Sequence, residues 1–267
     1  MRRRVLQKEK GSRAAVMGGQ IIGILLSIAL AVASCDAQAA AAWSAGQEPA
    51  DGSAPARESP DMIFEPEFTS TEIPDEVFER MAGKSYGEDC TVPREQLRYL
   101  RLSYTGFDGL PHTGEMIANK AIAGQLLEIF EALYEEGYPI ERIELIDVYD
   151  GDDEASMEAN NTSCFNFRKI AGSEKLSKHS LGLAVDINPL YNPYVKKKQE
   201  GLLVQPASAA GYADRSAVFL HKIEEGDSCL RLFLEHGFSW GGNWKSVKDY
   251  QHFEWEQKTG ETERENG

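Results

Sequence analysis

Cysteine, histidine and basic residues are all scarce in this sequence. Its 267 residues include only four cysteines, and no two of them form a C-x-x-C pair, so their spacing does not indicate a metal site. Lys and Arg number 28 against 43 Asp and Glu, which gives a formal net charge of −15. This excess of acid argues against a nucleic-acid-binding protein, because such binding depends on cations that neutralise phosphates.

A long apolar run is absent as well. The most apolar stretch, IIGILLSIALAVA, covers residues 21–33 and is shorter than the roughly 20 residues that a membrane-spanning helix needs. The basic segment MRRRVLQKEKGSR precedes it and small residues follow, which is the pattern of a secretory signal peptide. We therefore expect residues 1–34 to be a signal peptide and the protein to be exported. A permanent membrane anchor is the alternative.

The apolar stretch ends at VASC, residues 32–35, which resembles the lipobox of bacterial lipoproteins. In those proteins the cysteine is diacylated and becomes the new N-terminus, and two acyl chains anchor a protein stably. Cleavage before Cys35 would remove six Lys or Arg and one Asp or Glu, so the remaining chain would be still more acidic. We expect a lipoprotein anchored to the membrane through Cys35. An ordinary signal peptide that happens to contain a cysteine is the alternative.

The rest of the chain divides into a polar N-terminal segment, one domain and a short tail. Residues 36–66 are rich in Ala, Gly, Ser, Pro and acidic residues and show no apolar periodicity, which indicates a flexible tether. With a short helical lead-in at 67–85, the region 35–85 precedes a single domain at 86–257, and 258–267 is a polar tail. Besides Cys35, the exported chain would hold three cysteines, which we expect to be structural, with at most one disulfide: Cys90, Cys164 and Cys229.

The apolar patterns within this domain favour an α+β fold. Apolar residues follow one helical face between Ile117 and Glu136, a second short helix is expected around Leu230–Leu234, and residues 152–161 predict a short helix or a loop. Strands are expected mainly in the second half of the chain: Ile140–Tyr149, Cys164–Ile170 and Leu181–Ile187. This arrangement predicts a small, mostly antiparallel sheet flanked by helices.

The segment Ser177–Pro189, SKHSLGLAVDINP, carries a histidine and an aspartate in an otherwise apolar, strand-like run. His179 and Asp186 are residues of the types that bind zinc. Their separation of seven residues would place them on opposite faces of a straight strand, so we expect Gly182 to allow a bend that brings them together. For this stretch alone, a structural His–Asp pair is the alternative.

A catalytic zinc site has three protein ligands and one open position, so a third ligand has to come from elsewhere. Among the five histidines, His252 lies in DYQHFEW, three residues after Asp249. On a helical turn, residues at this spacing share one face, so one could bind the metal while the other reaches the water beside it. A surface histidine next to a solvated aspartate is the alternative.

Together these two stretches resemble the two motifs of the M15 family of zinc peptidases, which are bacterial cell-wall enzymes. The first motif of that family, S-x-H-x-x-G-x-A-x-D, is complete from Ser177 to Asp186. The second, an acid followed three residues later by the last histidine, corresponds to Asp249 and His252. The resemblance extends over Gly109–Trp255, and it implies a DD-peptidase-like fold with zinc in a cleft on the sheet.

Carried over residue by residue, the resemblance implies a role for each matching side chain. It implies three ligands of one zinc ion: His179, Asp186 and His252. It implies that Asp249 is the general base and that Arg168 stabilises the substrate carbonyl oxygen as it becomes an oxyanion. For Arg168 a surface ion pair is the alternative. Ser177 corresponds to a substrate-contacting serine, with a turn-capping hydroxyl as the alternative.

The family includes D-alanyl-D-alanine carboxypeptidases, dipeptidases and L-alanyl-D-glutamate endopeptidases. The resemblance therefore implies a metallopeptidase that hydrolyses peptidoglycan stem peptides, foremost as a D-alanyl-D-alanine carboxypeptidase, with the endopeptidase as the alternative. A non-catalytic zinc- or peptidoglycan-binding module on the same fold is a third interpretation. The presence of Asp249 favours an enzyme, because a module without turnover is expected to lose the base. We expect a monomer that faces the cell wall and has no nucleic-acid partner.

Overall fold

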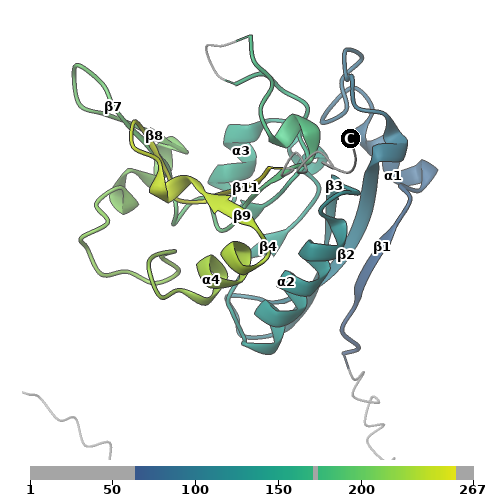
Figure 1. Cartoon of the computed structure of the whole chain (residues 1–267), viewed down its shortest axis with the longest axis horizontal. Helices are drawn as coiled ribbons and strands as arrows, with labels where there is room; N and C mark the ends of the chain where they lie inside the picture. Colours follow the sequence, from purple (N-terminus) through teal and green to yellow (C-terminus); the bar gives the residue numbers. More distant parts are fainter. Residues whose placement is uncertain (1–63, 171–173, 257–267) are drawn as a thin grey trace, which may run out of the picture. The chain divides into compact units, whose positions relative to one another are not determined.

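The longest strands form a hairpin in the first half of the domain (Figure 1). The computed structural model describes residues 64–170 and 174–256. Strands β2 (Leu97–Thr105) and β3 (Pro111–Asn119) pair antiparallel along their whole length, and β1 (Phe68–Thr71) pairs with the other edge of β2. This hairpin was not predicted from the sequence, although most of the strands in the described residues lie in the second half of the chain, as expected.

A second antiparallel sheet contains the C-terminal strand of the described residues. Strand β11 (His252–Trp255) lies in its middle, between β6 (Ala184–Asp186) and β9 (Phe238–Trp240). The predicted buried strand at Leu181–Ile187 is confirmed by β6, although the strand is shorter. Its residues Ala184, Val185 and Asp186 are all buried.

The remaining strands form two smaller groups. Strand β7 (Tyr194–Lys197) pairs antiparallel with both β8 (Leu202–Gln205) and β10 (Lys248–Asp249). The parallel pair consists of β4 (Arg142–Ile143) and β5 (Asn161–Thr162). The α+β class and the mostly antiparallel pairing are thus confirmed, with the strands divided among several small sheets.

Four α-helices accompany these sheets in the described residues: α1 (Asp75–Met81), α2 (Ala123–Glu135), α3 (Asp153–Glu158) and α4 (Ser228–Glu235). Helix α2 lies along the β1–β3 sheet and contacts α4 (Figure 1). The main core lies between these layers, and its largest fully buried side chains include Phe130, Phe233 and Phe253. The short helices predicted at 152–161 and around Leu230–Leu234 are confirmed by α3 and α4.

Two other predicted elements need correction. The helix expected from Ile117 begins only at Ala123, because Ile117 belongs to the buried end of β3 and continues the apolar pattern by coincidence. Within Ile140–Tyr149 only β4 is a strand, and the part from Ile146 onward is a 3-10 helix. Cys164–Ile170 is no strand, since its backbone N–H groups donate to carbonyls from separate parts of the chain.

Residues 64–85 pack on the domain that was expected to begin at position 86. Val77 and Met81 of α1 are buried in a second apolar cluster beside Leu97, Ile117 and Phe165. A fragment for experiments should therefore begin before β1.

The three cysteines within the described residues are all free thiols: Cys90, Cys164 and Cys229.

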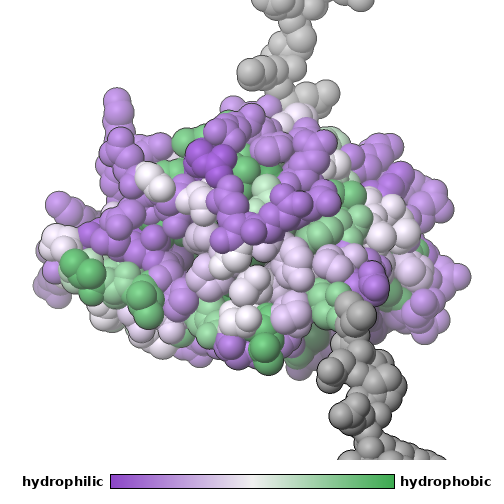
Figure 2. Space-filling model, turned by 90° about the horizontal axis from the view of Figure 1, so that it is seen from below, coloured by the Kyte–Doolittle hydropathy of each residue, from purple (hydrophilic) through white to green (hydrophobic). Residues whose placement is uncertain are grey.

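The predicted signal peptide at 1–34, Cys35, residues 36–63 of the tether and the tail at 258–267 lie outside the described residues. Among the described residues, no helix combines the length and the apolar character that crossing a membrane requires. Figure 2 shows one face of the molecule, on which hydrophilic residues predominate and hydrophobic ones form small patches.

The bend that precedes β6 depends on Gly182. The 3-10 helix His179–Leu181 ends at this residue, which has a φ of 64°, in the left-handed region. A Cβ atom there would lie 2.7 Å from the backbone nitrogen of Asn119. The expectation that Gly182 allows the chain to turn into the strand is confirmed.

We predict that Gly182→Ala lowers the free energy of unfolding by about 2 kcal/mol, because an L-residue is strained at positive φ and its methyl group has no room. Urea denaturation would measure the change. Gly124→Ala in α2 is the matched control, since nothing lies within 4 Å of a Cβ at that position and alanine favours helix. Equal effects of the two substitutions would contradict the prediction.

Candidate metal centre

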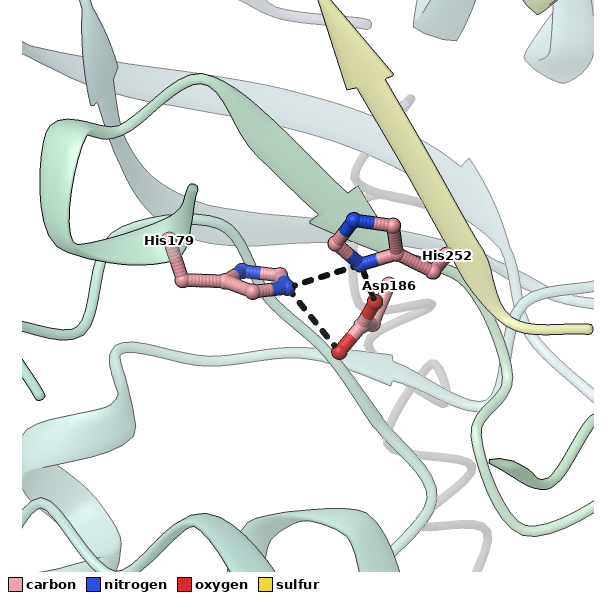
Figure 3. A group of neighbouring side chains, drawn as sticks. All are labelled: His179, Asp186 and His252. Carbon is pink, nitrogen blue, oxygen red and sulfur yellow. Dashed lines mark hydrogen bonds and ion pairs between the residues drawn. The ribbon is translucent and has the colours of Figure 1, made fainter. Parts of the chain in front are cut away.

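Three buried side chains from separate elements point toward a common position (Figure 3). His179 lies in the 3-10 helix before β6, Asp186 ends β6 and His252 begins β11. His179 Nε2 lies 3.1 Å from His252 Nδ1 and 3.3 Å from Asp186 Oδ2, and His252 Nδ1 lies 3.1 Å from Asp186 Oδ1. Sequence analysis predicted these three residues as ligands, and the fold brings them together.

The pairing of β6 with β11 explains part of this convergence. In the antiparallel register His252 lies directly opposite Asp186, and directly paired residues project to the same face of a sheet. The bend at Gly182 then places His179 beside them. The site therefore combines a cross-strand pair with a residue from the preceding turn.

Both histidine rings are oriented by a second contact. His179 Nδ1 lies 2.6 Å from the carbonyl oxygen of Cys164, which can only accept, so Nδ1 carries the proton and Nε2 is left as a ligand atom. His252 Nε2 lies 3.5 Å from Glu254 Oε2, which leaves Nδ1 directed at the site. Metal-binding histidines commonly have such partners, which fix the tautomer and the ring orientation.

The charges in the site favour a cation. Burial by itself would raise the pKa of Asp186, but His179 and His252 hold it well below its usual range. Burial by itself would lower the pKa of His252, whereas hydrogen bonds to Asp186 and Glu254 raise it to about 10. A positive charge is thus stabilised among these groups, whether a proton or a metal ion supplies it.

The donor set fits zinc. Two imidazole nitrogens and a carboxylate oxygen, all within 4.8 Å of one another, are the ligands found in catalytic zinc sites. His179, Asp186 and His252 also line a cavity of about 610 Å³, so a metal ion that they held would be accessible from it. The buried location explains why the ligands come from ordered elements and not from loops.

Asp249 also lines this cavity, but its setting differs from the expected helical turn. It ends β10 and pairs with Tyr194 of β7, whereas His252 belongs to another sheet. Burial raises the pKa of Asp249 to about 6 in spite of the positive charge of His252. Gln251 Nε2 donates to Asp249 Oδ1 at 3.3 Å. A carboxyl group with this pKa can accept and return a proton near neutral pH.

The backbone of Asp249 is held close to the loop that follows β9. A Cβ atom on Gly241 would lie 2.6 Å from the carbonyl oxygen of Asp249, so only glycine allows this approach. On either side of Gly241 lie two tryptophans with different surroundings. Trp240 is buried and donates its Nε1–H to Tyr250 O, whereas Trp244 lines the cavity, with its ring centre 5.3 Å from that of His252.

Arg168 lies on the cavity wall and forms an ion pair there. Its Nη2 is 2.8 Å from Asp153 Oδ2, and its buried Nε has no hydrogen-bond partner among the described residues. The Ser180 hydroxyl accepts from the backbone N–H of Arg168 and donates to its carbonyl oxygen. Asp153 was not identified from the sequence, because nothing in the local pattern of α3 indicates an arginine partner.

Ser177 lines the cavity and also caps the turn that carries the first ligand. Its hydroxyl oxygen accepts a hydrogen bond from the backbone N–H of His179 at 3.2 Å. The turn-capping contact considered for this residue is therefore present. A contact with substrate stays a prediction.

One sequence pattern that suggests a different chemistry has no support from the geometry. Residues Gly237–Gly241, GFSWG, satisfy the G-x-S-x-G pattern of a serine nucleophile between a strand and a helix. Ser239 is instead an exposed residue in the middle of β9. Its hydroxyl donates to the carbonyl oxygen of Glu254 at 3.4 Å, and no histidine is among its partners in the described residues.

Comparison with protein families gives a match over a segment that contains both motifs. Residues 171–255 match the M15 peptidase model described as D-alanyl-D-alanine carboxypeptidase. The resemblance to the M15 peptidases is confirmed for this segment, and it indicates a metallopeptidase. Arg168 lies just outside the matched residues. No curated protein and no solved structure matches the chain.

We predict that the purified protein binds one zinc ion and that His179→Ala or Asp186→Ala abolishes stoichiometric binding, because each substitution removes one of three ligands. Elemental analysis would measure the zinc content. His112→Ala is the control, since His112 is paired with Asp108 at 3.0 Å on the surface. Zinc should also raise the melting temperature of the wild type, because metal binding adds to folding free energy. Undiminished zinc in both ligand variants would refute the assignment.

Proposed function

We propose that this protein is a zinc-dependent peptidase that hydrolyses peptidoglycan stem peptides, foremost as a D-alanyl-D-alanine carboxypeptidase. The observation that carries the proposal is the meeting of three zinc-type ligands and a separate half-buried carboxylate, Asp249, in one cavity. The family match over residues 171–255 supports a peptidase of this class. The size of the cavity, about 610 Å³, suits a short peptide segment.

The proposed chemistry divides among the residues of the cavity. When bound by His179, Asp186 and His252, zinc supplies Lewis-acid chemistry that activates water and polarises a carbonyl group. Asp249 accepts the proton of the attacking water and returns it to the leaving amine. The Arg168 guanidinium, oriented by Asp153, stabilises negative charge on the carbonyl oxygen by charge-assisted hydrogen bonds.

Asp249 suits this role because it takes no part in the ligand set. Its hydrogen-bond partner is an amide, Gln251, and not a cation, so its carboxylate remains available to a proton. Asp249 also belongs to a different sheet from Asp186 and His252. Loss of the base should therefore leave the zinc site intact.

The decisive assay incubates the zinc-loaded protein with purified muropeptides that end in D-Ala-D-Ala, with products identified by mass spectrometry. Loss of a terminal alanine supports the carboxypeptidase. Release of the stem peptide from its first L-alanine identifies the L-alanyl-D-glutamate endopeptidase instead. Binding of zinc and muropeptide without any cleavage identifies a non-catalytic binding module.

We predict that Asp249→Asn keeps zinc but lowers turnover about 100-fold or more, because the nearly isosteric amide cannot accept the proton. Zinc content and initial rates would be measured on the same preparations. His252→Ala is the comparison, since it should lose zinc and activity together. Full activity of Asp249→Asn would assign the base to another cavity carboxylate, such as Glu254.

We also propose that the protein is exported and anchored to the membrane by lipid on Cys35, facing the cell wall where its substrate lies. The support is the sequence alone, in which VASC follows a basic segment and an apolar run.

We predict that the wild type fractionates with membranes and that Cys35→Ala releases it into the soluble exported fraction, because the acyl chains provide the anchor. Cell fractionation followed by mass spectrometry of the N-terminus would test this. An unmodified N-terminus that begins after Cys35 would overturn the proposal.

A further inference from the structure

One face of the β7–β8 hairpin forms a wall of the cavity. Side chains alternate between the two faces of a strand, and the cavity is lined by every second residue of β7, by their partners on β8 and by the residue that follows β7. These residues are Tyr194, Lys196, Lys198, Leu203 and Gln205. The residues of the opposite face do not line it: Val195, Lys197, Leu202 and Val204.

The hairpin is fixed relative to the proposed base. Tyr194 lies directly opposite Asp249 in the pairing of β7 with β10. Lys196 is two residues further along the strand, a distance of roughly 7 Å at about 3.3 Å per residue, and Lys198 is about as far again. An extended peptide bound in the cavity would pass these lysines within two to four residues of the bond beside Asp249, by the same rough spacing.

The two lysines contribute charge that no protein group neutralises. Lys196 and Lys198 are exposed and make no ion pair among the described residues. The other cations of the cavity differ in this respect, since Arg168 pairs with Asp153 and Lys178 lies 3.8 Å from Glu256. In a chain with a net charge of −15, unpaired lysines over a cavity create a local positive potential that attracts anions.

We propose that Lys196 and Lys198 form an anion subsite that binds a carboxylate of the peptide substrate. This inference rests on the proposed peptidase function and extends it to substrate selection. The chemistry fits a carboxylate at the C-terminus of the peptide or on a side chain within a few residues of the scissile bond. By itself, the run of three lysines at Lys196–Lys198 is typical of a solvated loop. In the structure Lys196, on β7, and Lys198, directly after it, line the cavity, whereas Lys197 does not.

The test uses three synthetic peptides of one sequence, with all carboxylates free, with a C-terminal amide, or with a side-chain amide. The Lys196→Gln, Lys198→Gln double variant should raise KM about threefold to tenfold on the free peptide, because exposed ion pairs are individually weak. Its kcat should stay within about twofold of the wild type, since the lysines do not touch the reacting atoms. The amide that removes the difference in KM identifies the carboxylate that the lysines bind.

Lys197→Gln is the matched control, because it removes the same charge from the opposite face of the same strand. It should leave KM unchanged. An equal rise in KM for Lys197→Gln and the double variant would mean a general charge effect and would overturn the subsite, as would an unchanged KM of the double variant on all three peptides.

Failure of the proposed peptidase function can be distinguished from failure of the anion subsite. If the zinc-loaded wild type cleaves none of the peptides, calorimetric binding of the same three peptides still tests the lysines. A threefold to tenfold loss of affinity of the double variant for the free peptide, absent for one amide, supports the subsite. Equal affinities of wild type and double variant reject it.

Discussion

The metal ligands depend on the register of one antiparallel strand pair, β6 with β11. In that register Val185 lies opposite Phe253, and Asp186 lies opposite His252. Val185 and Phe253 are fully buried in the main core, where Phe253 stacks on Phe233 with ring centres 4.2 Å apart. Because side chains alternate along a strand, burial of this apolar pair turns Asp186 and His252 toward the cavity. A slip of one residue would exchange the two faces, so the hydrophobic core itself positions the ligands.

Pairing of charges around the cavity distinguishes one carboxylate from the rest. Asp186 and Glu254 are partners of the histidines, and Asp153 is the partner of Arg168. Asp249 alone among the cavity carboxylates has an amide as its hydrogen-bond partner, within the described residues. Because Asp249 is half-buried and has no cation at hydrogen-bond distance, its pKa is raised to about 6, which is what proton transfer near neutral pH requires. The same fold thus gives similar side chains different roles by giving them different partners.

The sequence predicted which residues meet in the cavity better than it predicted the secondary structure around them. Ser177–Asp186 predicted the bend at Gly182 because a left-handed conformation depends on one residue and its neighbours. The β2–β3 hairpin was missed, and the helix was extended back to Ile117, because buried strands and helices have similar apolar content over short runs. The prediction of a strand at Cys164–Ile170 was wrong for another reason. The backbone of this segment forms hydrogen bonds with several distant segments, which no local pattern encodes. The pairs Arg168–Asp153 and His252–Glu254 likewise depend on tertiary packing, although Glu254 lies only two residues from its partner.

Asp249 and His252 are close in sequence, yet they are held by different parts of the structure. Asp249 ends β10, whose position is set by β7, whereas His252 begins β11, whose position is set by β6 and β9. The chain passes from one sheet to the other in the two residues between them, where Trp240 Nε1 donates to the carbonyl oxygen of Tyr250. Because Gly241 has no side chain, the loop after β9 can also approach the backbone of Asp249 closely. The position of the base relative to the ligands therefore depends on the contact between two sheets. The β7–β8 hairpin, which carries Lys196, belongs to the same sheet as Asp249. A shift of the backbone of that hairpin would therefore move Asp249 and the wall of the cavity together, while leaving the ligands in place.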